Sequence, residues 1–447
     1  MTQAERFDAI VIGANVAGLV SAHVLGSWGY RTALVERAPR VGGVDASFQS
    51  ERGRWFDFGL HALDELRSEL VTHFFESVLD GAVHRLERRR AIVLRGELIP
   101  YNADPKDWPA ALRRLMLHGG EQPLFDDIGA APPTRERLAR CYGRGFADLI
   151  CDDVLPSYPA DHRHAQLGVP AEKLLVNIYP WFFPRSRRER VALNASRVYQ
   201  DAVREQPRET MLYPDAGYFG AFPEAIARRC GAQGTELLLG ATDLRVDYRR
   251  ATRRVETVRA LGRELTAPRV YWCAPPAALC ELLGMPIPNA TPDTFVLGSV
   301  EYDRPVSCAY SELILGDPEH RLNRISFPGK LAVGDDNLVQ CEFAFPSAAP
   351  GWSTKPTEWL EDMARSLVRL GVVPGGARIL DSSLKLVPIF YNVYGAEGRE
   401  LPALDFREAL GPESNLRPVL PTYQKVNINT RVPQIVQFLT HDLTAHP

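Results

Sequence analysis

The apolar runs at the start of the chain predict a strand, a helix and a second strand. Residues 7–13, FDAIVIG, form a continuous apolar run that ends at a glycine. Residues 16–30 repeat apolar side chains at helical spacing, and residues 31–37, RTALVER, form a second buried run. Strands that are buried on both faces of a parallel sheet have this composition. The three segments therefore predict a βαβ unit.

The rest of the chain mixes short strands with helices. Residues 91–101 predict a hairpin, whereas the region from 103 to 205 lacks strand alternation and is predicted to be mainly helical. From 211 to 276 the pattern predicts a turn, a helix and then strands. From 290 to 390 it predicts strands and one helix.

The length of the chain, 447 residues, exceeds what one hydrophobic core usually supports, so two domains are expected. The pattern predicts an α/β fold. A discontinuous Rossmann-like dinucleotide-binding domain is interrupted by an inserted, mixed α+β substrate-binding domain. We assign residues 1–80, 205–290 and 400–447 to the first domain, and residues 81–204 and 291–399 to the second.

The composition is that of an ordinary globular protein, with 45% apolar residues, 24% charged residues and a net charge of −3. This charge gives no electrostatic signature of a nucleic-acid partner. No apolar stretch approaches the roughly 20 residues of an integral membrane segment, and no signal-peptide core precedes the first strand, so a cytoplasmic protein is expected. Seven scattered cysteines predict reduced thiols and no metal site. The oligomeric state stays open.

Three arginine-rich runs, at 85–90, 185–190 and 249–254, are predicted to be solvated surfaces. For the second run a substrate-binding role is also kept open.

A dinucleotide fingerprint of the form Gly-x-Gly-x-x-Gly follows the first strand, but Asn15 replaces its middle glycine. Gly13 is expected to make the tight turn, and Gly18 to let the helix pack closely on the strand. The middle position normally lets the backbone approach a pyrophosphate. Asn tolerates left-handed backbone better than other non-glycine residues, and its amide can donate to a phosphate oxygen, although its extra atoms displace the phosphate outward or sideways.

Further elements indicate which dinucleotide is bound. Glu36, at the end of the second strand, has the spacing of the acid that accepts ribose hydroxyls. The helix N-terminus at Val16 and Ala17 offers N–H groups to a diphosphate. Gly42 and Gly43 add backbone N–H groups that a flavin dinucleotide needs and NAD does not, so the cofactor is predicted to be FAD. The predicted cofactor contacts in this part of the chain are Gly13, Asn15, Val16, Ala17, Gly18, Glu36, Arg37, Gly42, Gly43 and Val44.

These segments resemble the N-terminus of a clan of FAD-containing enzymes. The clan includes protoporphyrinogen oxidase, phytoene desaturase, the amine oxidases and UDP-galactopyranose mutase. Its Arg-x-Gly-Gly-Arg motif matches at Arg40 and the glycine pair, whereas Val44 replaces the final Arg. Its Asp-x-Gly-x-His element matches Asp57, Gly59 and His61, which implies that His61 lies near the isoalloxazine ring. The alternative for His61 is a core histidine bonded to backbone.

The clan performs two kinds of chemistry, and the tail of the chain bears on the choice. In the mutases, a Tyr and a preceding Arg hold the substrate diphosphate. The resemblance matches that Tyr to Tyr423, but Leu420 stands where the Arg is expected, with Arg417 or Lys425 as substitutes. In the oxidases, a Gly-Asp pair ahead of the last helix contacts the flavin.

The mutase segment that contains this Tyr, Thr-Tyr-x-Tyr-x-Asp-Met-Asp, ends in two acids. Asn427 and Asn429 replace them here, and both are predicted to donate hydrogen bonds to the cofactor. The helix N-terminus behind them would face the flavin O2 edge and stabilise the reduced anionic flavin. The last helix is expected to begin near Asn429 or Thr430, because Pro433 is tolerated only in a first helical turn. A flavin-facing lysine, common in amine oxidation, is limited to Lys330, Lys385 or Lys425, each of which is more readily explained as a surface residue.

A small-molecule substrate is expected between the two domains. The stretch WFFPRSRRER offers Trp181 for stacking on a ring and Arg187 or Arg190 for binding a phosphate or carboxylate. Tyr391 and Tyr394 are candidates for the substrate face of the flavin. The predicted function is hydride transfer from a small organic substrate to flavin N5. The alternatives are a redox-neutral sugar mutase and a non-catalytic scaffold with the same fold.

Overall fold

The computed structural model describes most of the chain. The described residues are 4–64, 68–100, 110, 134–157, 210–286, 293–317, 322–332, 336–346, 356–389, 406–419 and 428–445. Seven predicted site residues lie outside these ranges. They are Trp181, Arg187, Arg190, Tyr391, Tyr394, Tyr423 and Asn427.

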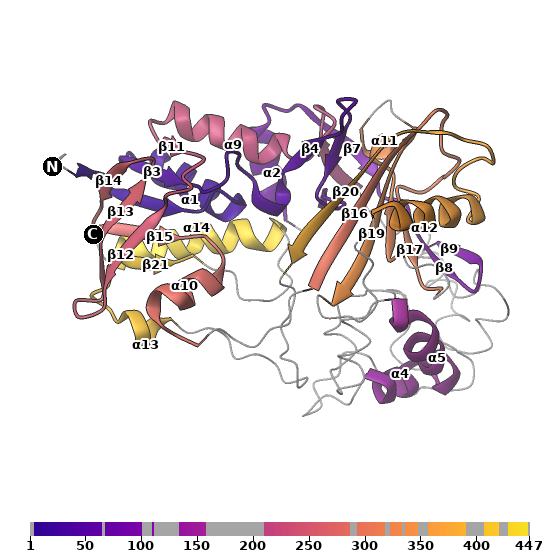
Figure 1. Cartoon of the computed structure of the whole chain (residues 1–447). Coiled ribbons are helices and arrows are strands. Elements are labelled where there is room, and N and C mark those ends of the chain that lie inside the picture. The colour runs from indigo at the N-terminus through magenta and orange to yellow at the C-terminus, as the bar shows by residue number, and fades with distance from the viewer. Residues whose placement is uncertain are drawn as a thin grey trace.

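A five-stranded parallel sheet forms one end of the molecule (Figure 1). Its strands, in spatial order, are β11 (Glu236–Leu238), β3 (Thr32–Val35), β2 (Ala9–Ile12), β15 (Arg269–Trp272) and β21 (Leu416–Pro418). Every pair of neighbours is parallel. The predicted βαβ unit is confirmed, and it lies in the middle of a sheet assembled from the beginning, the centre and the end of the chain.

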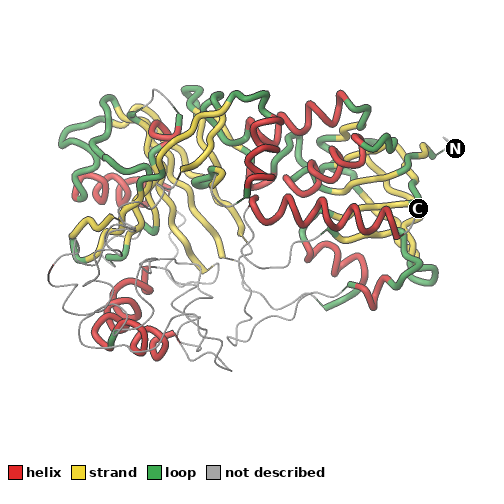
Figure 2. The backbone as a smooth tube through the Cα atoms, turned by 180° about the vertical axis from the view of Figure 1, so that it is seen from behind, coloured by secondary structure: helices red, strands yellow, loops and turns green. Residues whose placement is uncertain are grey.

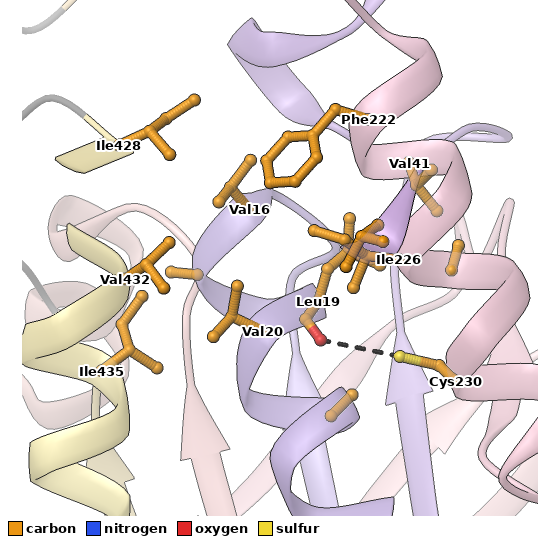
Figure 3. Packing of buried hydrophobic residues seen from close by; sticks show 14 of the residues in the cluster. Val16, Leu19, Val20, Val41, Phe222, Ile226, Cys230, Ile428, Val432 and Ile435 are labelled. Atoms are coloured by element: carbon orange, nitrogen blue, oxygen red, sulfur yellow. Dashed lines mark hydrogen bonds between the residues drawn. The ribbon is translucent and has the colours of Figure 1, made fainter. Parts of the chain in front are cut away.

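The helix of this unit, α1 (Val16–Ser27), is covered on both sides. Helices α9 (Ala221–Ala232) and α14 (Ile428–Ala445) pack against it, and α2 (Glu69–Val78) packs on these two. Figure 3 shows Val16 and Val20 facing Ile428 and Val432, and the Cys230 thiol of α9 donating to the Leu19 carbonyl. The two helices α1 and α14 thus run parallel, and their N-termini lie side by side.

The opposite face of the sheet packs on a second apolar cluster. It is covered by α10 (Pro276–Leu283) and by a four-stranded sheet whose strands are β1 (Glu5–Arg6), β14 (Arg263–Thr266), β13 (Arg254–Ala260) and β12 (Arg245–Arg249). The arginines of the 249–254 run are exposed, as predicted.

A seven-stranded sheet forms the other end of the molecule, opposite the helix-rich end in Figure 2. Its strands, in order, are β20 (Ile379–Ile389), β16 (Asp293–Tyr302), β19 (Leu338–Pro346), β18 (Arg324–Ser326), β17 (Glu312–Leu315), β8 (Arg90–Leu94) and β9 (Glu97–Pro100). The hairpin expected at 91–101 is confirmed as β8 and β9. Helix α12 (Pro356–Arg369) packs on one face through Trp359, Met363 and Leu367.

Smaller elements connect the two ends. Strands β6 (Leu63–Asp64), β10 (Thr210–Pro214) and β7 (Val83–Glu87) form an antiparallel sheet, and β4 (Ser47–Gln49) pairs with β5 (Trp55–Asp57). The remaining elements are α4 (Thr134–Tyr142), α5 (Arg144–Asp148), a π-helical turn at Leu149–Val154, two 3-10 turns at Gly43–Asp45 and Leu155–Ser157, α11 (Pro328–Leu331) and α13 (Arg407–Leu410).

Two local expectations differ from the structure. Helix α14 begins at Ile428, so Pro433 is its sixth residue and lies beyond the first turn, where its ring removes one backbone hydrogen bond. The run at 85–90 is not a solvated surface throughout. Arg88 exposes 16% of its side chain because it pairs with Asp64 and the buried Glu312. None of the helices in the described part of the chain has the length and apolar character that a membrane span requires.

Candidate cofactor site

The turn between β2 and α1 has the shape that the fingerprint predicts at its two glycines. Gly13 has a φ of +100°, and a Cβ there would stand 2.9 Å from the Ala274 nitrogen. A Cβ at Gly18 would fall 1.7 Å from the Gly13 oxygen. No other residue fits either position, so the turn and packing roles expected of these glycines are confirmed.

Asn15 does not use the left-handed backbone that Asn tolerates. It has a φ of −71° and a ψ of 178°, which is extended, and it is the N-cap of α1. Its Oδ1 accepts from the Gly18 N–H at 3.1 Å, and its Nδ2 donates to the Cys273 carbonyl at 2.8 Å. Asn is a favoured N-cap because its side chain satisfies a free N–H of the first turn. The amide therefore serves the protein's own backbone, and the N–H of Ala17 has no partner among the described residues.

The second glycine pair lies directly beside this turn. Gly42 forms an isolated parallel bridge with Asn15 and donates to the Ala14 carbonyl at 2.8 Å. Both glycines have left-handed backbone, with φ of +105° at Gly42 and +60° at Gly43. The two glycine motifs, separated in sequence by more than twenty residues, thus form one continuous backbone surface at the N-terminus of α1. Val44, which follows, exposes 45% of its surface, and Arg37 is also exposed.

Glu36 is held at the edge of this surface by two backbone groups. Its Oε2 accepts from the Ala14 N–H at 2.7 Å, and its Oε1 from the Ala38 N–H at 2.8 Å. Each carboxylate oxygen can accept two hydrogen bonds, so the fixed carboxylate keeps capacity for ribose hydroxyls.

The loop at 57–61 is anchored at Asp57. The buried Asp57 carboxylate accepts from the Ser47 hydroxyl, from the Tyr213 hydroxyl at 2.6 Å and from the Phe219 N–H at 2.9 Å. Burial raises the pKa of Asp57, although these donors and the nearby His61 oppose the shift. Burial and the neighbouring Asp57 likewise raise the pKa of Tyr213.

The same loop is also held by strand β19. Gln340 donates to the Asp57 carbonyl at 2.6 Å, and Glu342 accepts from the Leu60 N–H at 3.3 Å. Gly59 has a φ of +105°, and a Cβ there would approach Glu342 Oε1 to 3.2 Å. The seven-stranded sheet therefore fixes the segment that carries His61. Sequence patterns gave no signal for Gln340 or Glu342.

His61 is half-buried, but its Nδ1 atom is fully buried. Its ring packs on Phe219 with centroids 5.6 Å apart, and its buried Nδ1 has no hydrogen-bond partner among the described residues. Buried polar atoms are normally satisfied, so the free nitrogen is consistent with a ligand-facing role.

A charged network lies on the other side of Glu342. Glu312 is bound by Arg88 at 3.1 Å and Arg324 at 3.3 Å, and Arg324 also pairs with Glu342. Burial opposes the charge of Glu312, yet the attraction of Arg88, Arg324 and Arg90 outweighs it and lowers its pKa to about 2.

The structure describes only some of the residues predicted in the tail and only some of the candidate lysines. Asn429 lies in the first turn of α14. Arg417 pairs with Asp442 at 2.8 Å and donates to the Ser414 carbonyl. Lys330 pairs with Asp336 at 3.1 Å, and the exposed Lys385 stands 5.2 Å from the centroid of the Phe48 ring. Among the described residues, no three His, Cys, Asp or Glu side chains are grouped as a metal site requires.

Sequence comparisons match the N-terminal part of this site. Residues 11–78 fit a family model described as an NAD(P)-binding Rossmann-like domain. An all-trans-retinol 13,14-reductase from Rattus norvegicus is 37% identical over 78 residues, which are 17% of this chain and 13% of the relative. A flavin-containing amine oxidase from Oncorhynchus mykiss is 27% identical over 135 residues, which are 30% of this chain and 25% of the relative. The chain thus aligns with a quarter or less of each relative's length.

Solved structures match nearly the whole chain. Reduced UDP-galactopyranose mutase superimposes with a TM-score of 0.70 at 16% identity, over 98% of this chain and 96% of that one. This chain has the fold of the amine oxidase clan. A putrescine oxidase with bound putrescine also matches, with a TM-score of 0.62 at 16% identity over 99% of this chain and 100% of that one. The clan resemblance and the α/β fold with a Rossmann-like domain are therefore confirmed, and both the oxidase and the mutase branches share the fold.

Proposed function

We propose that this chain is an FAD-dependent oxidoreductase acting on a small organic molecule. The observation that carries the proposal is the backbone surface formed by the Gly13 turn, the N-terminus of α1 and the glycine pair at 42 and 43. A backbone surface with free N–H groups at Ala17 and Gly43 suits a diphosphate. Flavin is favoured over a nicotinamide cofactor because one relative is a flavin-containing oxidase.

Each part of the site has a distinct role in this proposal. Glu36 accepts the hydroxyls of the adenosine ribose, and the N–H groups of Ala17 and Gly43 bind the diphosphate. His61 lies at the isoalloxazine, where its free Nδ1 gains a partner. Residues 1–80, 205–290 and 400–447 hold the cofactor, and residues 81–204 and 291–399 bind the substrate. Trp181, Arg187, Arg190, Tyr391, Tyr394 and Tyr423 remain the proposed substrate contacts.

Bound FAD would accept a hydride from the substrate carbon at N5 and pass the electrons to dioxygen or another acceptor. The protein's own contribution is to hold the substrate carbon against the ring and to exclude water. The loop at 57–61 is suited to this task because Gln340 and Glu342 fix it from the seven-stranded sheet.

A redox-neutral mutase is the second candidate, because reduced UDP-galactopyranose mutase matches 98% of the chain. Arg417, one of the two residues offered as a substitute for the mutase arginine, is already paired with Asp442, which disfavours the mutase. Oxidoreduction is therefore the preferred proposal.

The test is a sequence of three measurements on the purified chain. A flavin absorbance spectrum, or a rise in melting temperature when FAD is added, supports both enzymes. The absence of both signals indicates a scaffold. Anaerobic mixing with candidate substrates then separates the enzymes. Flavin bleaching indicates hydride transfer, and turnover only after dithionite reduction indicates a mutase.

A further inference from the structure

A buried ion pair joins the glycine pair to the last helix. Asp45, in the turn that follows Gly43, exposes 1% of its surface, and its Oδ1 accepts from Arg431 of α14 at 3.3 Å. Arg431 exposes 17% of its side chain. The two residues are 386 positions apart in the chain.

Both members of the pair keep an unsatisfied polar atom. Asp45 Oδ2 and Arg431 Nε are buried, and neither has a hydrogen-bond partner in the part of the chain that the structure describes. An unpaired buried donor or acceptor is destabilising, and more so when it is charged. A pair present only to fasten α14 would be expected to use these atoms. The pair therefore has the capacity to bind a ligand that both accepts and donates hydrogen bonds.

The position of Arg431 indicates the charge of that ligand. It is the fourth residue of α14, close to the positive end of the helix, where a cation is unfavourable. The N-terminus of α1 adds a second positive end nearby, because the two helices begin side by side (Figure 3). One carboxylate, Asp45, faces this concentration of positive charge. A further anion at this place would be strongly favoured.

We propose that Arg431, positioned by Asp45, binds a phosphate oxygen of the cofactor, and that Asp45 Oδ2 accepts a neighbouring hydroxyl. The inference rests on the proposed FAD site. A phosphate next to a polyhydroxyl chain is the chemistry of the ribityl phosphate in a flavin nucleotide. Val44 replaces the arginine of the clan motif and is exposed in this turn. In this assignment Arg431, from the last helix, supplies a guanidinium beside the same turn.

The experiment compares two arginines that anchor the same helix. Arg417 pairs with Asp442 of α14 at 2.8 Å and exposes 18% of its side chain, which makes it a close match for Arg431. Full-length wild type, Arg431→Gln, Arg431→Lys, Asp45→Asn and Arg417→Gln are titrated with FAD, and the dissociation constant is read from quenching of flavin fluorescence. Melting temperatures of the same proteins without FAD report the loss of helix anchoring.

We expect Arg431→Gln to weaken FAD binding by about 10- to 100-fold, the range of one charge-assisted hydrogen bond. Arg431→Lys should recover part of this loss, and Asp45→Asn should weaken binding less than Arg431→Gln. Arg417→Gln should lower the melting temperature but leave the FAD dissociation constant within about twofold. The inference is overturned if Arg431→Gln binds FAD like the wild type, or if Arg417→Gln weakens binding equally. A wild type that binds no FAD would instead overturn the proposed function.

Discussion

Gly43 lies against Asn15: a Cβ at position 43 would stand 3.1 Å from the Asn15 Cβ. The residue that departs from the dinucleotide fingerprint is thus in contact with the second glycine pair. The effects of substitutions at positions 15 and 43 are therefore expected to depend on each other, because a side chain at one position limits the space for a side chain at the other.

We expect this coupling to appear in a double-mutant cycle. Gly43→Ala should lower the free energy of unfolding by about 1–2 kcal/mol, since position 43 has left-handed backbone and the new methyl group meets Asn15. In an Asn15→Gly background the contact is gone and only the backbone cost remains, so the loss should be smaller by about 0.5 kcal/mol or more. Urea unfolding of the four proteins measures both values. Strictly additive effects would contradict the contact.

The N-cap role of Asn15 gives a second prediction. Asn15→Ala should lower the free energy of unfolding by about 1–2 kcal/mol, because Gly18 loses its acceptor and the Cys273 carbonyl its donor. Asn15→Gly should bind FAD at least as tightly as the wild type, since the Gly18 N–H becomes available to a phosphate. The control is Ser68→Ala, which removes the matching N-cap of α2 and should change stability alone. Loss of FAD from Asn15→Gly would show that the amide itself contacts the cofactor.

Anchoring of the 57–61 loop by β19 is testable by hydrogen exchange. Glu342→Gln should speed exchange of the Leu60 amide by about 5- to 20-fold, because its acceptor is weakened and Arg324 loses a charged partner. Glu301→Gln is the matched control, since this buried carboxylate holds Arg52 and Arg54 instead. It should affect residues near 52–54 and leave the 57–61 loop protected. Equal exchange in both variants would show that the loop does not depend on β19.

The charged network predicts a defined dependence of stability on pH. The pKa of Glu312 is lowered to about 2 from an ordinary value of 4.5, so its contribution is fully present above pH 4.5 and is lost as pH falls toward 2. Glu312→Gln should therefore lower the free energy of unfolding by about 3–5 kcal/mol at pH 7, and by less at pH 4 and below. Urea titrations at several pH values measure the difference. A constant difference across this range would exclude Glu312 as the titrating group.

The sequence was informative where local chemistry determines structure. The first βαβ unit, the hairpin at 91–101 and the geometric roles of Gly13 and Gly18 are all set by neighbouring residues, and each was predicted correctly. The N-cap role of Asn15 was not predicted, although the signal was present. An Asn immediately before a helix is a favoured N-cap, and that role requires extended backbone.

Long-range pairs left no such signal. Asp45 and Arg431 meet only because α14 packs on α1. Arg88 is largely covered only because Glu312 lies on a strand that joins the sheet from elsewhere in the chain. An arginine-rich run has the same sequence whether its side chains are solvated or paired with carboxylates. The one available hint was Arg431 itself, a cation in the first turns of a helix, where the dipole disfavours it.

The burial of α1 has a consequence for the order of events during synthesis. Seven successive residues of this helix, 16–22, are buried, and α14, which covers one side of it, is made some 400 residues later. A nascent chain emerging from the ribosome thus carries an unfinished apolar surface for nearly the whole of translation. The first helix to be made can reach its native environment only when the last one arrives, which leaves an interval in which chaperones can act.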